Sequence, residues 1–370
     1  MPWIRTANVA MYEGADWSGF VKTVSGCTPQ QAQRIAMADP SIRFFFFCRE
    51  FMILTNPAWS GPRTFEPGDA VFFSGEPWFG GAPQCDSYQK DGLSLAYMGG
   101  VTETSPAVAA QFTTAQGLNA VDIVCLFGAN LNLAVPDNDV RLAPDVPVPS
   151  GGTLAVAGSG WPAAMQESVA TLQAQGIIVL ITFVNNWDAA GWSNFDPTTT
   201  QGQQDAQNFA LQLQSLVKTY GLDGIDIDDE YAKPDLGIPN SLAMVTSMIR
   251  TLMPDKILSK ALWADEQYFG PTYDGVGLAQ NLTYGWYMGY GSDPSAILPT
   301  YAGFGMEPSQ LAMGYWTGQS AYPPTLGIDW MKSKGYAGYM TYATESAGNQ
   351  ALLGDLVNAW MGPGNWNETG

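Results

Sequence analysis

The feature that most limits the possible folds is an alternation of short β-prone runs with helical stretches after Gly92. Helical stretches such as PAAMQESVATLQAQ and QQDAQNFALQLQSLVKTY separate several of the runs. The runs are LSLAYM, DIVCLFGA, IIVLITFV, LDGIDID, ILSKALWA, LTYGWYMGY, QLAMGYW and YAGYMTYA. This alternation is typical of βα units around a parallel sheet, and about eight such units close a barrel. We therefore predict an α/β fold with a (β/α)8 TIM barrel over residues 92–370.

Residues 1–91 have a different pattern and precede the barrel. TPQQAQRIAMADP predicts a short helix, with Thr28 as N-cap, Pro29 in the first turn and Gln31 completing a capping box. The run IRFFFFCREFMIL and the segment GDAVFFSGEPWFGG each predict a strand. We expect a small N-terminal α+β module, to which the sequence assigns no role. The Pro- and Gly-rich stretch 136–160 is expected to be an irregular insertion in the barrel.

Composition excludes several classes of function. Hydrophobic residues make up 46% of the 370 residues, which is enough to bury a large core and excludes a disordered chain. The net charge of −19 repels phosphate backbones, so neither nucleic acid nor an anionic membrane is expected as a partner. No apolar run is long enough to predict a membrane span. The oligomeric state stays open.

Histidine is absent, which removes the imidazole of serine and cysteine hydrolases and the commonest zinc ligand. The cysteines Cys27, Cys48, Cys85 and Cys125 show no CxxC spacing, so we expect no metal and no cofactor. A disulfide among the first three would suit a secreted protein, with the pairing left open, and Cys125 is expected to be an inert core residue. Acid–base chemistry must fall to carboxylates, Tyr or Lys.

The segment LDGIDIDDEY, residues 222–231, carries the most chemical information. Side chains alternate along a strand, so Asp226, Asp228 and Glu230 share one face and the isoleucines face the other way. In a barrel the acidic face is the interior, and the row climbs towards the C-terminal mouth, where barrel enzymes place their chemistry.

Three acids in one row cannot all ionise in a poorly solvated interior, so at least one must hold a proton near neutral pH. A protonated carboxylic acid beside an ionised partner is what cleavage of a glycosidic bond requires. The alternatives are a solvated loop or a calcium site. A calcium loop needs Gly within the turn and a twelve-residue ligand pattern, which this segment lacks.

DGIDIDDE resembles the DGxDxDxE signature of glycoside hydrolase family 18, and DGIDIDDEYA is similar to its endo-β-N-acetylglucosaminidases of the H and F type. VLITFVNNWDAAGWSNF and DIVCLFGANLNL resemble the third and second strands of that branch. Chitinases of the family usually carry Trp at the positions of Asp229 and Tyr342, which favours the endoglycosidase branch. The resemblance covers residues 93–362.

The resemblance implies roles for four residues. In family 18 the 2-acetamido group of the substrate attacks the anomeric carbon. Glu230 would protonate the leaving oxygen and later activate water. Asp228 would orient the acetamide and stabilise an oxazolinium ion, Asp226 would support Asp228, and Tyr290 would hydrogen-bond the acetamide. The candidate sugar contacts are Asn185, Asn186, Trp187, Tyr287 and Tyr342, although an Asn in such a loop often only closes a turn.

The resemblance therefore implies a glycosidase that cuts between the two core N-acetylglucosamines of N-linked glycans. The alternatives are a chitinase and a non-catalytic carbohydrate-binding barrel, the latter disfavoured because all three acids are present. Asp223 is expected to order the start of its strand. The start MPWIRTANVA shows no signal peptide, yet the resemblance favours a secreted, periplasmic or cell-surface location.

Overall fold

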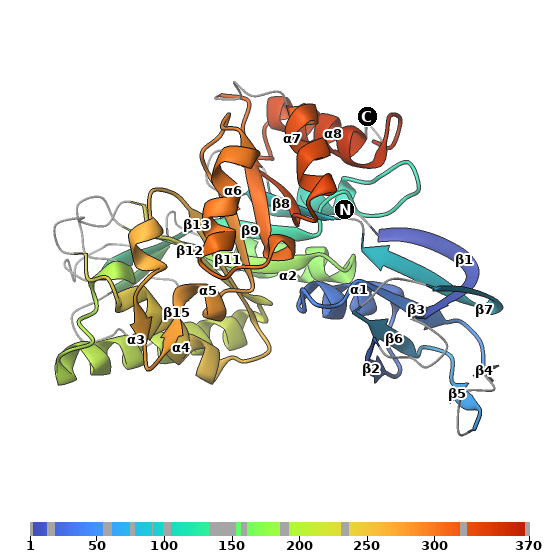
Figure 1. The fold of residues 1–370 in the computed structure, drawn as a ribbon, viewed down its shortest axis with the longest axis horizontal. Helices are drawn as coiled ribbons and strands as arrows, with labels where there is room; N and C mark the ends of the chain where they lie inside the picture. Colours follow the sequence, from blue (N-terminus) through green and yellow to red (C-terminus); the bar gives the residue numbers. More distant parts are fainter. Residues whose placement is uncertain are drawn as a thin grey trace.

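The computed structural model describes residues 3–12, 19–54, 61–74, 78–90, 92–98, 105–132, 153–156, 161–185, 192–230, 237–318 and 324–366. Two large sheets organise them. One sheet is parallel and closes into a barrel, and the other is antiparallel and lies beside one end of that barrel (Figure 1).

The barrel confirms the predicted fold class. Pairing of β8 with β9 closes the ring of eight parallel strands, and each strand coincides with one of the eight predicted runs, although β9 and β11 extend beyond the ends of theirs. The strands are β8 (Leu93–Met98), β9 (Ile123–Asn132), β11 (Ile178–Asn185), β12 (Gly224–Asp228), β13 (Ile257–Leu262), β16 (Tyr284–Tyr287), β17 (Leu311–Tyr315) and β18 (Gly338–Thr341).

One further strand, β10 (Thr153–Val156), pairs antiparallel with β9. It lies within the 136–160 stretch, for which the sequence analysis expected irregular structure. That expectation is wrong for residues 153–156, because their backbone groups pair with the extended end of β9. The remainder of the stretch lies outside the described residues.

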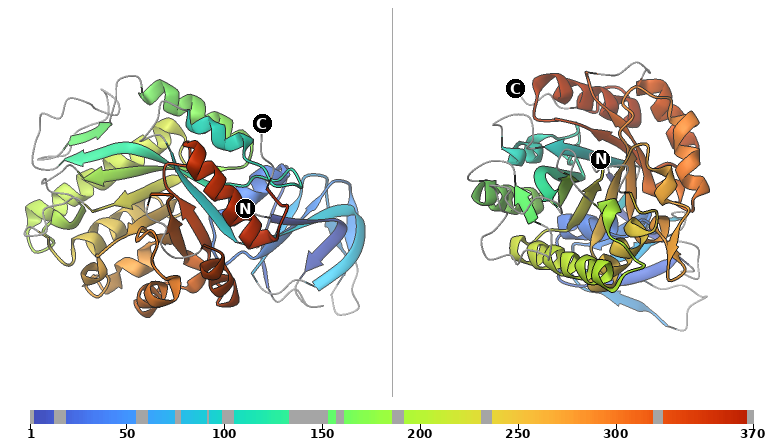
Figure 2. Two further views of the ribbon diagram at one scale, coloured as in Figure 1. Left: turned by 90° about the horizontal axis from the view of Figure 1, so that it is seen from above. Right: turned by 90° about the vertical axis from the view of Figure 1, so that its left-hand side faces the viewer.

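Helices surround the strands, as the right-hand view of Figure 2 shows. They are α2 (Trp161–Ala174), α3 (Thr200–Tyr220), α4 (Ser241–Leu252), α5 (Leu278–Asn281), α6 (Pro294–Gly303), α7 (Pro324–Ser333) and α8 (Ala347–Met361). The shorter elements are η1 (Pro106–Gln111), η2 (Trp192–Asn194), η4 (Glu266–Tyr268), η5 (Pro308–Gln310), β14 (Thr272–Tyr273) and β15 (Val276–Gly277). Among the described helices, none combines the length and the apolar character needed to cross a membrane.

Local sequence determines where α3, the helix that leads into the carboxylate strand, begins and ends. The Thr199 hydroxyl accepts a hydrogen bond from the Gly202 amide and caps the first turn. Gly221 ends the helix with a φ of 64°, a left-handed conformation that a residue without Cβ adopts at little cost. The chain therefore turns within three residues from the helix into β12.

Residues 3–90 form the antiparallel sheet in the order β1 (Trp3–Tyr12), β7 (Trp78–Lys90), β3 (Phe44–Cys48), β6 (Ala70–Phe73) and β2 (Phe20–Val24). A small hairpin, β4 (Met52–Leu54) with β5 (Arg63–Phe65), extends from it. The predicted helix is confirmed as α1 (Pro29–Met37), with the Thr28–Gln31 capping box in place. GDAVFFSGEPWFGG does not form one strand: β6 ends at Phe73 and β7 begins at Trp78.

Helix α1 lies between this sheet and the barrel (Figures 1 and 2). The Tyr284 hydroxyl, from β16, donates to the Met37 carbonyl at 2.7 Å, and Lys90 Nζ donates to the same hydroxyl at 3.2 Å. The apolar cluster inside the barrel continues without a break into Met37 and Phe45 of the N-terminal part. The N-terminal sheet and its helix therefore close the floor of the barrel.

Candidate active site

Asp226 lies inside the barrel and has no exposed surface. Its carboxylate accepts hydrogen bonds from the hydroxyls of Tyr97 at 2.5 Å, Ser259 at 2.7 Å and Thr182 at 2.9 Å, which come from β8, β13 and β11. Trp286 Nε1 donates in turn to the Tyr97 hydroxyl at 2.7 Å. The acidic face of β12 therefore points into the interior, as period-two alternation predicts.

Burial raises the pKa of Asp226 to about 6, although its three hydrogen bonds and the charge of Lys260 oppose the rise. The carboxyl group is therefore mostly ionised at neutral pH. Hydrogen bonds that favour the charged form hold this anion in a site where burial alone would neutralise it.

Asp228, the last residue of β12, has a more extreme environment. It is 1% exposed, and burial together with the charges of Glu230 and Asp226 raises its pKa well above the usual range. Its Oδ1 has no hydrogen-bond partner among the described residues. These effects favour the protonated form of Asp228.

Glu230 follows at the mouth of the barrel and is half-buried. The row thus rises from the interior at Asp226 through Asp228 to a residue that solvent reaches. Asp229 lies between the last two in sequence and turns away from them, because its Oδ1 accepts a hydrogen bond from the Trp192 amide at 3.0 Å. The alternation therefore places Glu230 where a substrate can contact it and directs Asp229 to the neighbouring backbone.

A buried cation lies behind the acidic strand. Lys260 on β13 is 1% exposed and forms an ion pair with Asp265 at 2.5 Å. Tyr301 donates to the other oxygen of Asp265 at 2.8 Å. Burial alone would lower the pKa of Lys260, but the charges of Asp265 and Asp229 raise it above its ordinary value.

Lys260 was not predicted as a site residue, although a lysine inside the apolar run ILSKALWA is an unusual feature of the sequence. A charged side chain in a barrel strand needs a buried partner of opposite charge. Its positive charge also acts on the carboxyl groups of Asp226 and Asp228, where it opposes the effect of burial on both pKa values.

Aromatic rings gather near the acids. The Tyr290 ring lies 5.8 Å from that of Trp316 and 6.1 Å from that of Tyr342, and Phe127 lies 5.8 Å from Tyr342. Burial and the charges of Asp228 and Glu230 raise the pKa of Tyr342. The Tyr342 hydroxyl therefore interacts electrostatically with the acidic row. The structure thus brings Tyr290 and Tyr342 together beside the acids. Phe127 and Trp316 were not predicted, although each lies on or just after a barrel strand.

Tyr287 lies elsewhere. Its ring is 6.0 Å from that of Trp263 and 6.1 Å from that of Tyr301, within the outer cluster between strands and helices. The structure therefore separates it from the acidic row. Asn185 ends β11, and its side chain, together with Asn186 and Trp187, lies outside the described residues.

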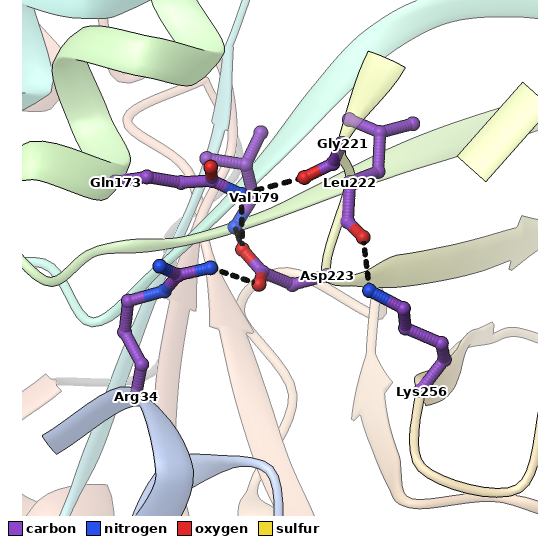
Figure 3. Close-up of polar contacts among 7 residues, drawn as sticks. All are labelled: Arg34, Gln173, Val179, Gly221, Leu222, Asp223 and Lys256. Carbon is purple, nitrogen blue, oxygen red and sulfur yellow. Dashed lines mark hydrogen bonds and ion pairs between the residues drawn. The ribbon is translucent and has the colours of Figure 1, made fainter. Parts of the chain in front are cut away.

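Asp223 lies at the opposite end of β12 (Figure 3). It accepts hydrogen bonds from Gln173 Nε2 at 2.9 Å and from the Val179 amide at 2.9 Å, and it forms an ion pair with Arg34 of α1. These contacts fix the residue that precedes the strand to the neighbouring strand β11 and to the N-terminal helix, which is the ordering role expected for it.

The sequence has relatives of known activity, although no protein-family model matches the chain. It is 28% identical over 281 residues to an endo-β-N-acetylglucosaminidase of Flavobacterium sp. (strain SK1022), which covers 71% of this chain and 78% of the relative. It is 25% identical over 265 residues to endo-β-N-acetylglucosaminidase F1 of Elizabethkingia meningoseptica, covering 69% and 73%.

Solved structures share the fold. EndoBT-3987 of Bacteroides thetaiotamicron, solved with a Man5GlcNAc product, has a TM-score of 0.57 and 15% identity over 99% of this chain and 91% of that one. A class V chitinase of Cycas revoluta has a TM-score of 0.50 and 13% identity over 73% and 99%.

The closed barrel, the acidic row and these relatives indicate a glycoside hydrolase that is similar to the enzymes of family 18. The two sequence relatives are both endo-β-N-acetylglucosaminidases, so within that family the chain is most similar to the endoglycosidase branch.

Proposed function

We propose that this enzyme hydrolyses the β-1,4 bond between the two core N-acetylglucosamines of N-linked glycans. The observation that carries the proposal is the row Asp226–Asp228–Glu230, in which two buried acids on β12 lead to a partly exposed acid at the mouth of the barrel. The sequence relatives support the reaction, since both are named endo-β-N-acetylglucosaminidases.

The proposed chemistry is substrate-assisted and retains anomeric configuration. The acetamide oxygen of the substrate attacks C1, the bond from C1 to the leaving oxygen breaks, and Glu230 transfers its proton to that oxygen. Water then attacks C1 and opens the oxazolinium ring, while the Glu230 carboxylate takes up the proton that water loses. Glu230 thus returns to its starting state.

Asp228 and Asp226 would serve the ring closure. The Oδ1 of Asp228, which has no hydrogen-bond partner among the described residues, would accept the acetamide N–H, and the negative charge of the acidic row would stabilise the positive charge that develops on the ring. Tyr290 would hydrogen-bond the acetamide. Tyr342 and its aromatic neighbours would form the walls of the sugar site.

The substrate class rests on similarity. EndoBT-3987 has also been solved with a Man9GlcNAc2Asn substrate, with a TM-score of 0.56 to this chain. A chitinase is the second candidate, because the Cycas revoluta enzyme shares the barrel. Asp229 and Tyr342 stand where that group usually carries Trp, which favours the N-glycan.

We also propose that residues 1–91 and 92–370 act as a supporting module and a catalytic barrel. The contacts of α1 with Asp223 and Tyr284 support such a division of labour. A secreted, periplasmic or cell-surface location would give the enzyme access to glycoproteins.

The test is an incubation of the purified chain with a high-mannose glycoprotein, a biantennary glycoprotein and chitin oligomers, followed by mass spectrometry. We expect one N-acetylglucosamine to stay on the asparagine and the rest of the glycan to be released. Glu230→Gln serves as the inactive control. Cleavage of chitin oligomers with both glycoproteins left intact would replace the proposal with the chitinase.

A further inference from the structure

We propose that Cys48 and Cys85 form a disulfide that joins β3 to β7 in the N-terminal sheet. The two residues are direct partners in the antiparallel register of these strands. Their Sγ atoms lie 3.2 Å apart, and neither residue has exposed surface. The inference does not depend on the proposed catalytic function.

The backbone geometry suits a covalent link. Arg49 N donates to Gln84 O at 2.8 Å, so the neighbouring pair is a hydrogen-bonded one. Cys48 N instead donates to Asp69 O at 2.9 Å, towards the strand on the other side. Cys48 and Cys85 thus occupy a non-hydrogen-bonded position, where facing Cα atoms approach to about 4.5 Å. Disulfides span Cα separations of about 4.4–6.8 Å.

The other two cysteines do not compete for this pairing. The Cys27 thiol is directed at the carbonyls of Gly68 at 3.5 Å and Val24 at 3.7 Å, and it packs against the cluster that continues into the barrel. Cys48 and Cys85 belong to a separate cluster. Cys125 is buried inside the barrel. The structure therefore selects one pairing among those that the sequence left open.

The bond must form before the sheet closes. Both thiols are buried, and burial together with the neighbouring thiol raises the pKa of Cys48 far above its ordinary value, so the folded pair is a poor nucleophile. In the open chain, one thiolate attacks a small disulfide such as oxidised glutathione and releases one thiol. The second cysteine then attacks this mixed disulfide and releases the other. The protein loses two protons and two electrons, and the oxidant becomes two thiols.

The link would close a loop that contains β4, β5 and β6. Closing such a loop restricts the unfolded chain more than the folded one, so the bond stabilises the sheet. The adjoining hairpin, β4 with β5, would gain most, since its own pairing is only three residues long.

The test is refolding of the full chain in a glutathione redox buffer. The product is then unfolded without reductant, alkylated with iodoacetamide and digested for mass spectrometry. We expect a Cys48–Cys85 cross-linked peptide, lighter than its two parts by two hydrogen atoms, with Cys27 and Cys125 alkylated. Alkylation of both Cys48 and Cys85 would overturn the proposal, and so would a link that includes Cys27.

Stability supplies a second readout. Reductant should lower the melting temperature of the oxidised wild type by several degrees and leave the double variant Cys48→Ala/Cys85→Ala unchanged. Cys125→Ser is the matched control, since it should keep both the cross-link and the response to reductant. An identical response in wild type and double variant would count against the bond.

Discussion

The two aspartates at the two ends of β12 have the same side chain but different surroundings, and they are expected to have different roles. Asp223, at the barrel floor, meets an arginine, an amide side chain and a backbone amide. Asp228, at the mouth, lies near two further acids and has an oxygen with no described partner. The floor residue is satisfied within the fold. The Asp228 oxygen has no such partner among the described residues and is open to a hydrogen bond from a bound substrate.

Polar contacts have opposite effects on folding at the two ends of the strand. Contacts at the floor favour folding, because every oxygen of Asp223 is paired before any ligand arrives. Repulsion among the acids at the mouth disfavours folding, and a positive charge that develops on a bound sugar would relieve it.

The largest effect is expected for the acid at the mouth. Glu230→Gln keeps the shape of the side chain but cannot donate a proton, so kcat should fall by about 10²- to 10⁴-fold with an unchanged circular dichroism spectrum. Glu167→Gln, at an exposed position of α2, is the matched control and should leave kcat unaltered. Turnover of Glu230→Gln within about a factor of two of wild type would remove Glu230 from the mechanism.

The second prediction compares the same substitution, Asp to Asn, at the two ends of β12. Asp228→Asn should slow hydrolysis of a glycopeptide by about 10²-fold or more, yet still accept a preformed N-acetylglucosamine oxazoline for transfer, since that substrate bypasses ring closure. Asp223→Asn should leave kcat close to wild type and lower the free energy of unfolding by about 1–3 kcal/mol, because Arg34 loses its charged partner.

Steady-state kinetics and urea denaturation separate the two outcomes. The contrast fails if Asp223→Asn loses activity without loss of stability, or if Asp228→Asn hydrolyses as fast as wild type. A thiazoline analogue of the intermediate should inhibit the wild type. Detection of a glycosyl ester on any carboxylate would instead indicate an enzyme-borne nucleophile.

The third prediction concerns pH. The folded-state pKa of Asp226 is raised from 3.8 to about 6. The folded chain therefore binds this proton more tightly than the unfolded one, and the stabilisation, complete below about pH 4, is lost as pH rises through about 6. At about 1.4 kcal/mol per pKa unit, the contribution is at most about 3 kcal/mol.

Urea denaturation of wild type and Asp226→Asn at several pH values between about 4 and 7 measures this contribution. The amide cannot titrate. The unfolding free energy of the wild type should therefore fall relative to that of Asp226→Asn as pH rises. Parallel pH profiles for the two proteins would show that Asp226 titrates normally in the folded state.

The smallest effect is expected from chelation. The acidic row is proposed to handle protons, and the chain contains no histidine, so EDTA should change kcat/KM by less than about twofold. Activity that is lost in EDTA and restored by one divalent metal would instead indicate that the acidic row binds a metal.

Short-range patterns allowed the barrel and the row to be predicted. Eight apolar runs separated by helical stretches gave the strand positions, and period-two alternation gave the inward face of Asp226 and Asp228. The same alternation could have warned that Tyr287 faces outward, since it follows the inward Trp286 by one residue. Its role as a sugar contact stays a prediction.

Contacts between distant segments were beyond the reach of these patterns. The pairing of Lys260 with Asp265 depends on how the chain turns after β13. The rings of Phe127, Tyr290 and Trp316 come from separate parts of the barrel and each lies near the ring of Tyr342. The hydrogen bond from Tyr284 to Met37 spans most of the chain. Periodicity reports which face of an element is buried but not what covers it.

The shared core at the barrel floor has a consequence for how the enzyme comes apart. Because one apolar cluster includes Phe45 and Phe72 of the N-terminal sheet and Leu95 and Met340 of the barrel, neither part can open without exposing the other to water. The two should unfold in a single cooperative transition, with amides in β3 and β18 exchanging hydrogen at similar, slow rates. A gene fragment for residues 92–370 alone would leave the bottom of the barrel uncovered, and its product should aggregate rather than act as a minimal enzyme.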